Sequence, residues 1–215
     1  MKQLIIFDLD GTLLNTIADL ANSTNYALSQ LGINAHPLES FNTFVGNGIR
    51  KLFERALPVT VRTPEMVEKV RSLFIPHYDI HNIDKTTIYP GITELLTTLQ
   101  DRGIKIAVAS NKYQKASEKL MKHYFPNIQF CGILGQREGI PVKPDACIVN
   151  EILKIAGVPA ESVLYVGDSG VDMQTAKNGQ VESVGVTWGF RPLAELQANG
   201  AQHIINKPEE LVELI

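Results

Sequence analysis

The sequence has few cysteines and no long apolar run, and both absences exclude whole classes of protein. Only two cysteines, Cys131 and Cys147, occur in 215 residues, which is too few for a disulfide framework. Neither has a histidine or a second cysteine at the spacing of a zinc site. The first apolar run, Leu4 to Phe7, is too short for a signal peptide, and no run approaches the roughly 20 residues of a membrane span. We therefore expect a cytoplasmic protein that does not enter a membrane.

An excess of charge of either sign is also missing. The formal net charge is -3, with 20 basic against 23 acidic residues. This balance gives no electrostatic reason to expect a nucleic acid or an anionic membrane as partner. It does not exclude a small anionic substrate, because such a substrate needs only local positive charge. The chain is long enough to bury a hydrophobic core in one or two domains.

Short apolar runs alternate with helical patterns over most of the chain. The runs span residues 4–7, 104–109, 163–166 and 184–186, with 204–205 as a candidate edge strand. Apolar residues at helical spacing occur between them, at 91–100 and 145–156. Strands that alternate with helices predict a parallel sheet with helices on both faces, which is an α/β, doubly wound, Rossmann-like fold.

The segment from residue 13 to residue 85 follows a different pattern. It predicts helices at 17–31, 44–56 and 64–78, joined by polar residues and without an alternating strand pattern. Thr63 before Pro64 is typical of a helix start, with the threonine as the cap. We therefore predict a small all-helical domain at 15–85, inserted after the first strand, and a core domain formed by 1–14 and 86–215.

Asp8 and Asp10 directly follow the first predicted strand. Residues at i and i+2 of an extended segment point to the same side, so both carboxylates can face one ligand, and Gly11 lets the chain turn away. Two carboxylates this close repel each other unless a cation lies between them or one keeps its proton. A divalent cation would neutralise the pair, and a protonated Asp10 could act as a general acid. The alternative is an ordinary Asp-Gly surface turn.

Polar residues also end two other predicted strands. Ser110 and Asn111 end the second strand, and their side chains suit a phosphate oxygen, together with backbone N–H groups of a following helix. Asp168 ends the third strand and could complete an oxygen site of the kind that magnesium prefers, with Asp172 one helical turn further on. The alternative at both places is a helix cap, with Asp168 or Ser169 as the capping residue of the second.

Lys143 lies just before a predicted helix and is followed by Pro144, which stiffens the loop. Ligands of an open parallel sheet bind beyond the carboxyl ends of its strands, so we expect this lysine and the polar strand ends to meet in one crevice. There a fixed ammonium could hold both the Asp8 carboxylate and an incoming phosphate. A solvated surface lysine is the alternative.

At these residues the sequence resembles the haloacid dehalogenase-like hydrolases. Four motifs of that family stand here in order, as Asp8-Leu9-Asp10-Gly11-Thr12-Leu13, Ser110-Asn111-Lys112, Lys143-Pro144-Asp145 and Gly167-Asp168-Ser169-Gly170-Val171-Asp172. The resemblance covers essentially the whole chain. It implies that the core domain is catalytic and that residues 15–85 form a cap, which is the arrangement of the phosphoglycolate phosphatase-like members.

The resemblance implies a magnesium-dependent phosphatase that works through an aspartyl-phosphate intermediate. Asp8 resembles the nucleophile, Asp10 the acid and base, and Ser110 with Lys143 the clamp on the phosphate. The implied magnesium ligands are the carboxylates of Asp8 and Asp168 and the main-chain carbonyl of Asp10. The remaining family-like positions are the supporting residues Asp172 and Ser169 and the substrate contacts Thr12, Asn111, Gly46, Asn47 and Arg50.

The resemblance implies that the substrate is a small phosphorylated metabolite. It also implies that the protein is a monomer or a homodimer. Our first expectation is 2-phosphoglycolate. A phosphosugar mutase, a pyrophosphatase and a catalytically idle binding protein on the same fold are the alternatives. Two positions depart from the family pattern: Asn15 stands where relatives often carry an aspartate, and Ala146 where they often carry a proline. Neither removes a catalytic group, but Asn15 alters the expected contacts at the cap hinge.

Overall fold

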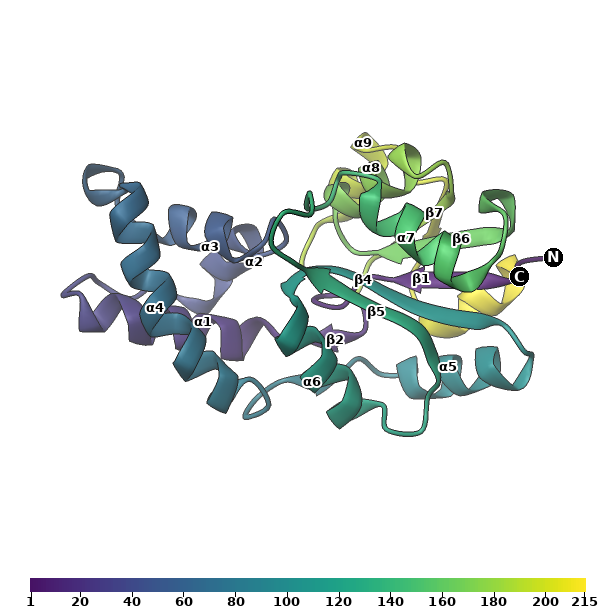
Figure 1. Cartoon of the computed structure of the whole chain (residues 1–215), viewed down its shortest axis with the longest axis horizontal. Coiled ribbons are helices and arrows are strands. Elements are labelled where there is room, and N and C mark those ends of the chain that lie inside the picture. The colour runs from purple at the N-terminus through teal and green to yellow at the C-terminus, as the bar shows by residue number, and fades with distance from the viewer.

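The computed structural model describes all 215 residues, which form two lobes side by side (Figure 1). One lobe is built on a six-stranded sheet in the order β5-β4-β1-β6-β7-β8, and every neighbouring pair in it is parallel. The predicted fold class is therefore confirmed. The strands of this sheet are β1 (Leu4–Phe7), β4 (Lys105–Tyr113), β5 (Phe130–Gln136), β6 (Val163–Gly167), β7 (Glu182–Val186) and β8 (His203–Ile205).

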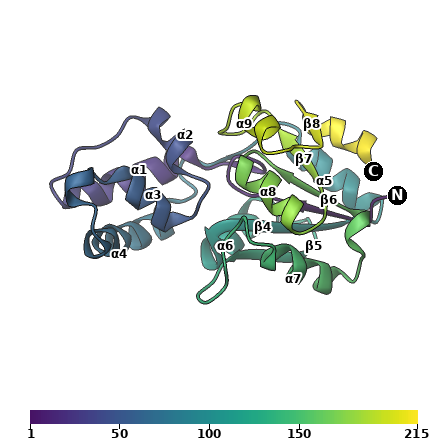
Figure 2. The same cartoon turned by 90° about the horizontal axis from the view of Figure 1, so that it is seen from above.

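Helices cover both faces of this sheet, as the view from above shows (Figure 2). Ile5 and Phe7 of β1 pack into one hydrophobic cluster with α5 and α6, while Leu4 and Ile6 point into another with α7 and α8. Both faces of the sheet at β1 are therefore buried under helices, which explains why β1 is apolar at every position. The helices of this lobe are α5 (Ile92–Asp101), α6 (Gln114–Tyr124), α7 (Cys147–Ala156), α8 (Gly170–Asn178) and α9 (Leu193–Ala198), with the 3-10 turns η3 (Ala160–Ser162) and η4 (Pro208–Leu214).

Two strands differ from the sequence-based expectation. β4 does not end before Ser110 but continues through Tyr113, with an irregular register to β5 after Ala109. β5 was not predicted, because its apolar residues are interrupted by glycines. One of these glycines, Gly135, lies so close to β4 that no larger residue fits, because a Cβ there would lie 2.6 Å from the Lys112 carbonyl oxygen.

The second lobe is helical and has its own hydrophobic cluster of 16 buried residues. Only Ala116 of that cluster comes from the sheet lobe. Thr63 caps a helix as predicted, because its Oγ1 accepts a hydrogen bond from Met66 N at 3.2 Å. No helix of the protein has the length and apolar character that crossing a membrane requires. The helices of this lobe are α1 (Ile17–Gln30), α2 (Phe41–Phe44), α3 (Ile49–Ala56) and α4 (Pro64–His81), with the turns η1 (Leu38–Ser40) and η2 (Val59–Val61).

The single helix predicted at 44–56 is wrong, because the chain breaks between α2 and α3. Gly46 and Gly48 adopt φ angles of 115° and 83°, which lie outside the helical range and which glycine reaches without strain. The break turns a loop of the helical lobe toward the carboxyl ends of the strands, where Gly46 and Gly48 both line a cavity.

The two lobes are joined by a short antiparallel ribbon of β2 (Leu14–Asn15) and β3 (Thr87–Ile88). The buried Asp19 carboxylate fixes the returning chain by accepting hydrogen bonds from Thr86 N and Thr86 Oγ1, both at 2.8 Å. The predicted domain borders fall at this ribbon, and the division of the chain into two domains stays a prediction. Asn15 takes part in the joint, where its Oδ1 accepts a hydrogen bond from Ile17 N at 3.4 Å.

Candidate active site

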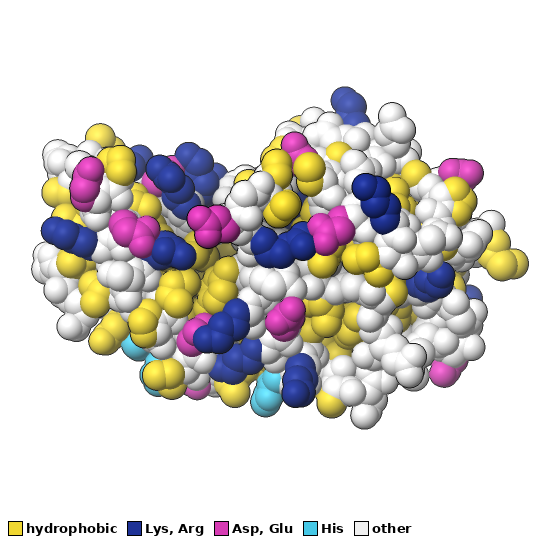
Figure 3. Space-filling model, viewed as in Figure 1, with side chains coloured by type: hydrophobic (Ala, Val, Ile, Leu, Met, Phe, Trp, Pro, Cys, Tyr) yellow, Lys and Arg dark blue, Asp and Glu magenta, His cyan; other side chains and the backbone are white.

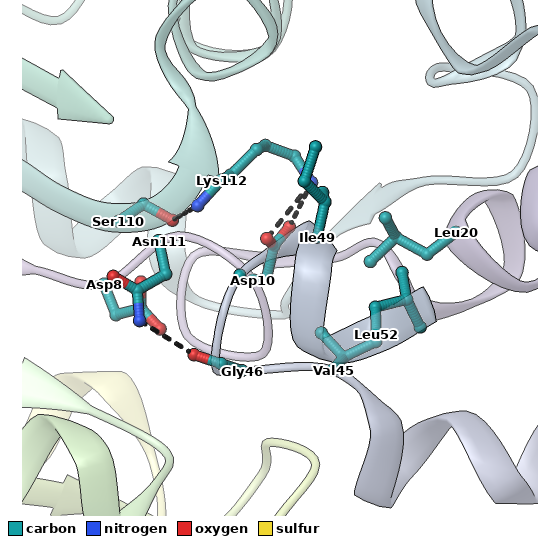
Figure 4. A pocket seen from close by; sticks show the side chains of 11 residues that line it. Asp8, Asp10, Leu20, Val45, Gly46, Ile49, Leu52, Ser110, Asn111 and Lys112 are labelled. Atoms are coloured by element: carbon teal, nitrogen blue, oxygen red, sulfur yellow. Dashed lines mark hydrogen bonds and ion pairs between the residues drawn. The ribbon is translucent and has the colours of Figure 1, made fainter. Parts of the chain in front are cut away.

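Polar groups from four parts of the chain meet at the carboxyl end of the sheet. Asp8 follows β1, Asp168 follows β6, Ser110 lies in β4, and Lys143 precedes α7. The three strands are neighbours at the centre of the sheet, which brings their ends together. A small cavity opens there between the lobes (Figure 4), and the space-filling view shows the surface hollowed where the lobes meet (Figure 3). It is lined by Asp8, Asp10, Leu20, Val45, Gly46, Gly48, Ile49, Leu52, Ser110, Asn111 and Lys112.

Three buried aspartates form an acidic cluster beside this cavity. Asp8, Asp168 and Asp172 each offer a carboxylate oxygen within 4.8 Å of the others. Burial, followed by the charge of Asp172, raises the pKa of Asp8 to about 7. Burial also raises the pKa of Asp168 well above its usual range, and the charges of Asp172 and Asp8 add to this effect. The negative charge of the cluster must therefore be offset by a cation or by protonation of one carboxylate.

Lys143 supplies part of that positive charge. Its ammonium is buried and lies 2.7 Å from Asp172 Oδ1, 2.9 Å from the Ala109 carbonyl oxygen and 2.9 Å from Asp8 Oδ1. Burial alone would lower the pKa of Lys143, but the carboxylates of Asp172 and Asp8 outweigh burial and raise it. Asp172 also accepts a hydrogen bond from Ser169 Oγ at 2.6 Å, within a capping box at the start of α8. Both oxygens of Asp172 thus have partners within the protein, whereas Asp8 lines the cavity.

The surroundings of Asp8 and Asp168 fit a divalent cation. Asp8 Oδ1 is buried, and its ion-pair partner, the Lys143 ammonium at 2.9 Å, lies outside hydrogen-bonding geometry. Asp168 is enclosed by two glycines, since a Cβ on Gly11 would lie 2.3 Å from Asp168 Oδ2 and a Cβ on Gly189 2.2 Å from Asp168 Cβ. The Phe190 amide donates to Asp168 Oδ2 at 2.7 Å and fixes that carboxylate. Three buried carboxylates with only one ammonium among them form an environment that a hard cation such as Mg²⁺ completes.

Asp10 is paired with Lys112, a motif residue for which the sequence indicates no role. Lys112 Nζ lies 2.9 Å from Asp10 Oδ1 and 3.1 Å from Asp10 Oδ2, and Thr16 Oγ1 donates to the same carboxylate at 2.7 Å. The lysine is buried, and its ammonium lies 4.8 Å from the ring centre of Tyr78 in α4. Ser110 and Lys112 stand at i and i+2 of one strand, so the argument applied to Asp8 and Asp10 could have found this residue.

Ser110 and Asn111 both line the cavity but differ in how they are bonded. Ser110 Oγ accepts a hydrogen bond from Lys112 N at 3.2 Å, which leaves its hydroxyl proton available for a ligand. Asn111 Nδ2 instead donates to the carbonyls of Gly46 and Lys143 at 3.1 and 3.2 Å, and its Oδ1 accepts from Lys143 N at 2.8 Å. Its amide therefore joins the loop of the helical lobe to the loop that carries Lys143.

The other predicted substrate contacts lie in different places. Gly46 lines the cavity, whereas Asn47, Arg50 and Thr12 do not. The Arg50 side chain is 72% exposed and pairs with Glu54 at 3.1 Å on the surface. Thr12 is fully buried, and its Oγ1 has no hydrogen-bond partner. The assignment of Asn47, Arg50 and Thr12 to the substrate therefore stays a prediction.

In this protein the central strands of a doubly wound sheet end in carboxylates, and a buried lysine lies among them. This arrangement is typical of α/β enzymes that bind an anion at the carboxyl ends of the strands. The family model described as haloacid dehalogenase-like hydrolase matches residues 5–186 of this sequence. The chain therefore belongs to the haloacid dehalogenase-like hydrolase family, and the resemblance found in the sequence is confirmed.

The relatives of the chain agree with this membership. It is 35% identical over 191 residues to a phosphoglycolate phosphatase of Mesorhizobium japonicum, covering 88% of this chain and 84% of the relative. It is also 35% identical over 202 residues to a phosphoglycolate phosphatase of Pseudomonas savastanoi pv. phaseolicola, covering 91% of this chain and 74% of the relative. A crystal structure from Lactobacillus delbrueckii subsp. bulgaricus, described as a candidate phosphoglycolate phosphatase, superimposes with a TM-score of 0.94 at 36% identity, covering 100% of this chain and 99% of that chain.

Proposed function

We propose that the chain is a magnesium-dependent phosphatase of small phosphomonoesters, with 2-phosphoglycolate as its preferred substrate and an aspartyl-phosphate intermediate on Asp8. One observation carries the proposal: Asp8 lies buried at the mouth of β1, between the Lys143 ammonium and the Asp168 carboxylate, and borders a cavity. The relatives named phosphoglycolate phosphatase support the choice of substrate. The chain is accordingly a phosphoric monoester hydrolase.

Asp8 must be ionised to attack phosphorus, and its surroundings oppose this when no cation is bound. Its raised pKa, about 7, would leave a large fraction protonated near neutrality. Magnesium would be held by the carboxylates of Asp8 and Asp168 and by the main-chain carbonyl of Asp10. When bound, the ion would favour the ionised Asp8 and neutralise charge on the transferred phosphoryl oxygens.

The remaining groups handle the phosphate and the proton. The Lys143 ammonium and the Ser110 hydroxyl hold non-bridging oxygens while an Asp8 oxygen bonds to phosphorus and the bond to the leaving oxygen breaks. Asp10 gives the leaving oxygen its proton and then takes one from the water that cleaves the acyl phosphate. The helical lobe borders the cavity through Gly46 and Ile49, so its closure over a bound substrate would exclude bulk water.

The proposal is tested by phosphate release from a panel of phosphorylated metabolites, with magnesium and with EDTA. We expect turnover of 2-phosphoglycolate that EDTA abolishes and that added magnesium restores. Release of phosphate from pyrophosphate alone would favour a pyrophosphatase, and interconversion of sugar phosphates without free phosphate would favour a mutase. Full activity in EDTA would overturn the metal dependence.

A cytoplasmic location and a monomeric or dimeric state complete the proposal. Cys131 and Cys147 are unpaired, which supports a reducing compartment. Light scattering on the purified protein distinguishes one copy from two.

A further inference from the structure

The cavity has two unlike walls, and the proposed mechanism gives the wall away from Asp8 no part in choosing the substrate. Apolar side chains form most of it: Leu20 from α1, Val45 from the loop after α2, and Ile49 with Leu52 from α3. Lys112 is the only cationic residue that lines the cavity. Figure 4 shows the lysine reaching Asp10 on the side of Ile49, away from Asp8.

Lys112 depends on Asp10 for its neutralisation. Its side chain is 2% exposed, and Asp10, at 2.9 Å, is its acidic partner. A buried ammonium without an anion is strongly unfavourable, and the nearby Tyr78 ring offsets only part of that cost. In the proposed reaction Asp10 must turn to the leaving oxygen, and Lys112 then requires a second anion.

We propose that Lys112 is the residue that determines specificity, by binding an anionic group on the leaving alcohol in place of Asp10. The inference rests on the proposed function and deepens it. The carboxylate of 2-phosphoglycolate lies one carbon from the ester oxygen that Asp10 protonates, so it can reach the ammonium that Asp10 releases. The apolar wall offers no partner for sugar hydroxyls, and it disfavours phosphosugars because their polar groups would be buried unpaired.

A series of substrates tests this on the unmodified protein. 2-Phosphoglycolate, 2-hydroxyethyl phosphate and O-phosphoethanolamine have leaving groups of similar length that carry a negative, a neutral and a positive end. We expect kcat/KM to fall about 10- to 100-fold from the first to the second, as for a lost hydrogen bond to a charged group, and further for the third. Equal values for all three would overturn the inference.

Variants of the lysine separate substrate binding from a structural role. Lys112→Met keeps the length and removes the charge, and we expect it to reduce kcat/KM for 2-phosphoglycolate about tenfold more than for 2-hydroxyethyl phosphate. Lys112→Arg should keep part of the preference for the anionic substrate. The control is Lys115→Met, which removes an exposed lysine paired with Asp79 and should leave the ratio unchanged.

The possible failures differ from one another. If Lys112→Met lowers both substrates equally, the lysine only holds Asp10 and the inference is overturned, while the proposed function stands. If the unmodified protein hydrolyses other phosphomonoesters but not 2-phosphoglycolate, the proposed substrate fails as well. If Lys112→Met does not fold, as judged by circular dichroism, the substrate series on the unmodified protein decides alone.

Discussion

The two walls of the cavity differ in origin and in bonding. The inner wall comes from the sheet lobe. Of its groups, Asp8 lines the cavity, whereas Lys143 and Asp168 lie beside Asp8 and are held by groups from neighbouring strands and loops. The outer wall comes mostly from the helical lobe and is apolar apart from Lys112. The difference suggests a division of labour: the groups proposed to break the bond lie at the sheet, whereas the proposed selection of the substrate is shared by Lys112 of β4 and the apolar side chains of the inserted helices. Four substitutions test this division, from the largest expected effect to the smallest.

Asp8→Asn should have the largest effect, because it removes the proposed nucleophile. We expect kcat to fall on the order of 10⁴-fold or more, as for other enzymes that lose a nucleophile. Phosphate release by the purified variant measures this, with circular dichroism to confirm an intact fold. Near-normal turnover would show that Asp8 is not the nucleophile.

Lys143→Met should destabilise the fold strongly, because it leaves Asp172 buried without its cation. Breaking a buried ion pair on one side costs about 3–5 kcal/mol in the free energy of unfolding. Urea denaturation measures this, and Lys143→Met combined with Asp172→Asn should recover part of the loss. Lys115→Met, which breaks an exposed pair, should cost less than about 1 kcal/mol. Similar losses of unfolding free energy for Lys143→Met and Lys115→Met would contradict the importance of the buried ion pair between Lys143 and Asp172.

Val45→Thr should change selection without changing the chemistry, because it places one hydroxyl in the outer wall at nearly constant volume. We expect kcat/KM for glycerol phosphate to rise roughly threefold to tenfold relative to 2-phosphoglycolate. Val67→Thr is the matched control, since Val67 is similarly buried in the helical lobe but does not line the cavity. An equal shift in both variants would mean that the ratio reports stability rather than contact with the substrate.

Arg50→Gln should have the smallest effect, because its exposed side chain pairs only with Glu54 and lies outside the cavity. We expect a change within about 0.5 kcal/mol in the free energy of unfolding and less than about a twofold change in kcat/KM. A large rise in KM for 2-phosphoglycolate would instead support Arg50 as a substrate contact, as the sequence predicts, and would require a rearrangement of the loop after Gly48.

The sequence predicts the inner wall well for a geometric reason. Asp8 and Asp168 follow short apolar runs that predict buried parallel strands, and the carboxyl ends of such strands meet at one edge. Lys143 was harder to place, because no strand carries it. Its burial among Asp8 and Asp172 is visible only in three dimensions.

The outer wall could not be predicted in the same way. The spacing from Ser110 identifies Lys112 as a residue of the same strand face, but its pairing with Asp10, 102 residues away, and the Tyr78 ring that covers it depend on the tertiary structure. Periodicity identifies helices but not which of their apolar residues face a cavity rather than the core. The break at Gly46 and Gly48, which brings Val45 and Ile49 to the site, was hidden by the apolar residues on either side.

The ribbon of β2 and β3 has a consequence for how such an enzyme changes over time. The chain leaves the sheet lobe at Leu14 and returns at Ile88, and these two residues are paired neighbours. Because the exit and the entry lie side by side, a short turn can connect them and close the chain at little entropic cost. The helices between them could therefore be exchanged as a unit, which would replace the apolar side of the cavity and keep Asp8, Asp168 and Lys112 of the sheet lobe in place.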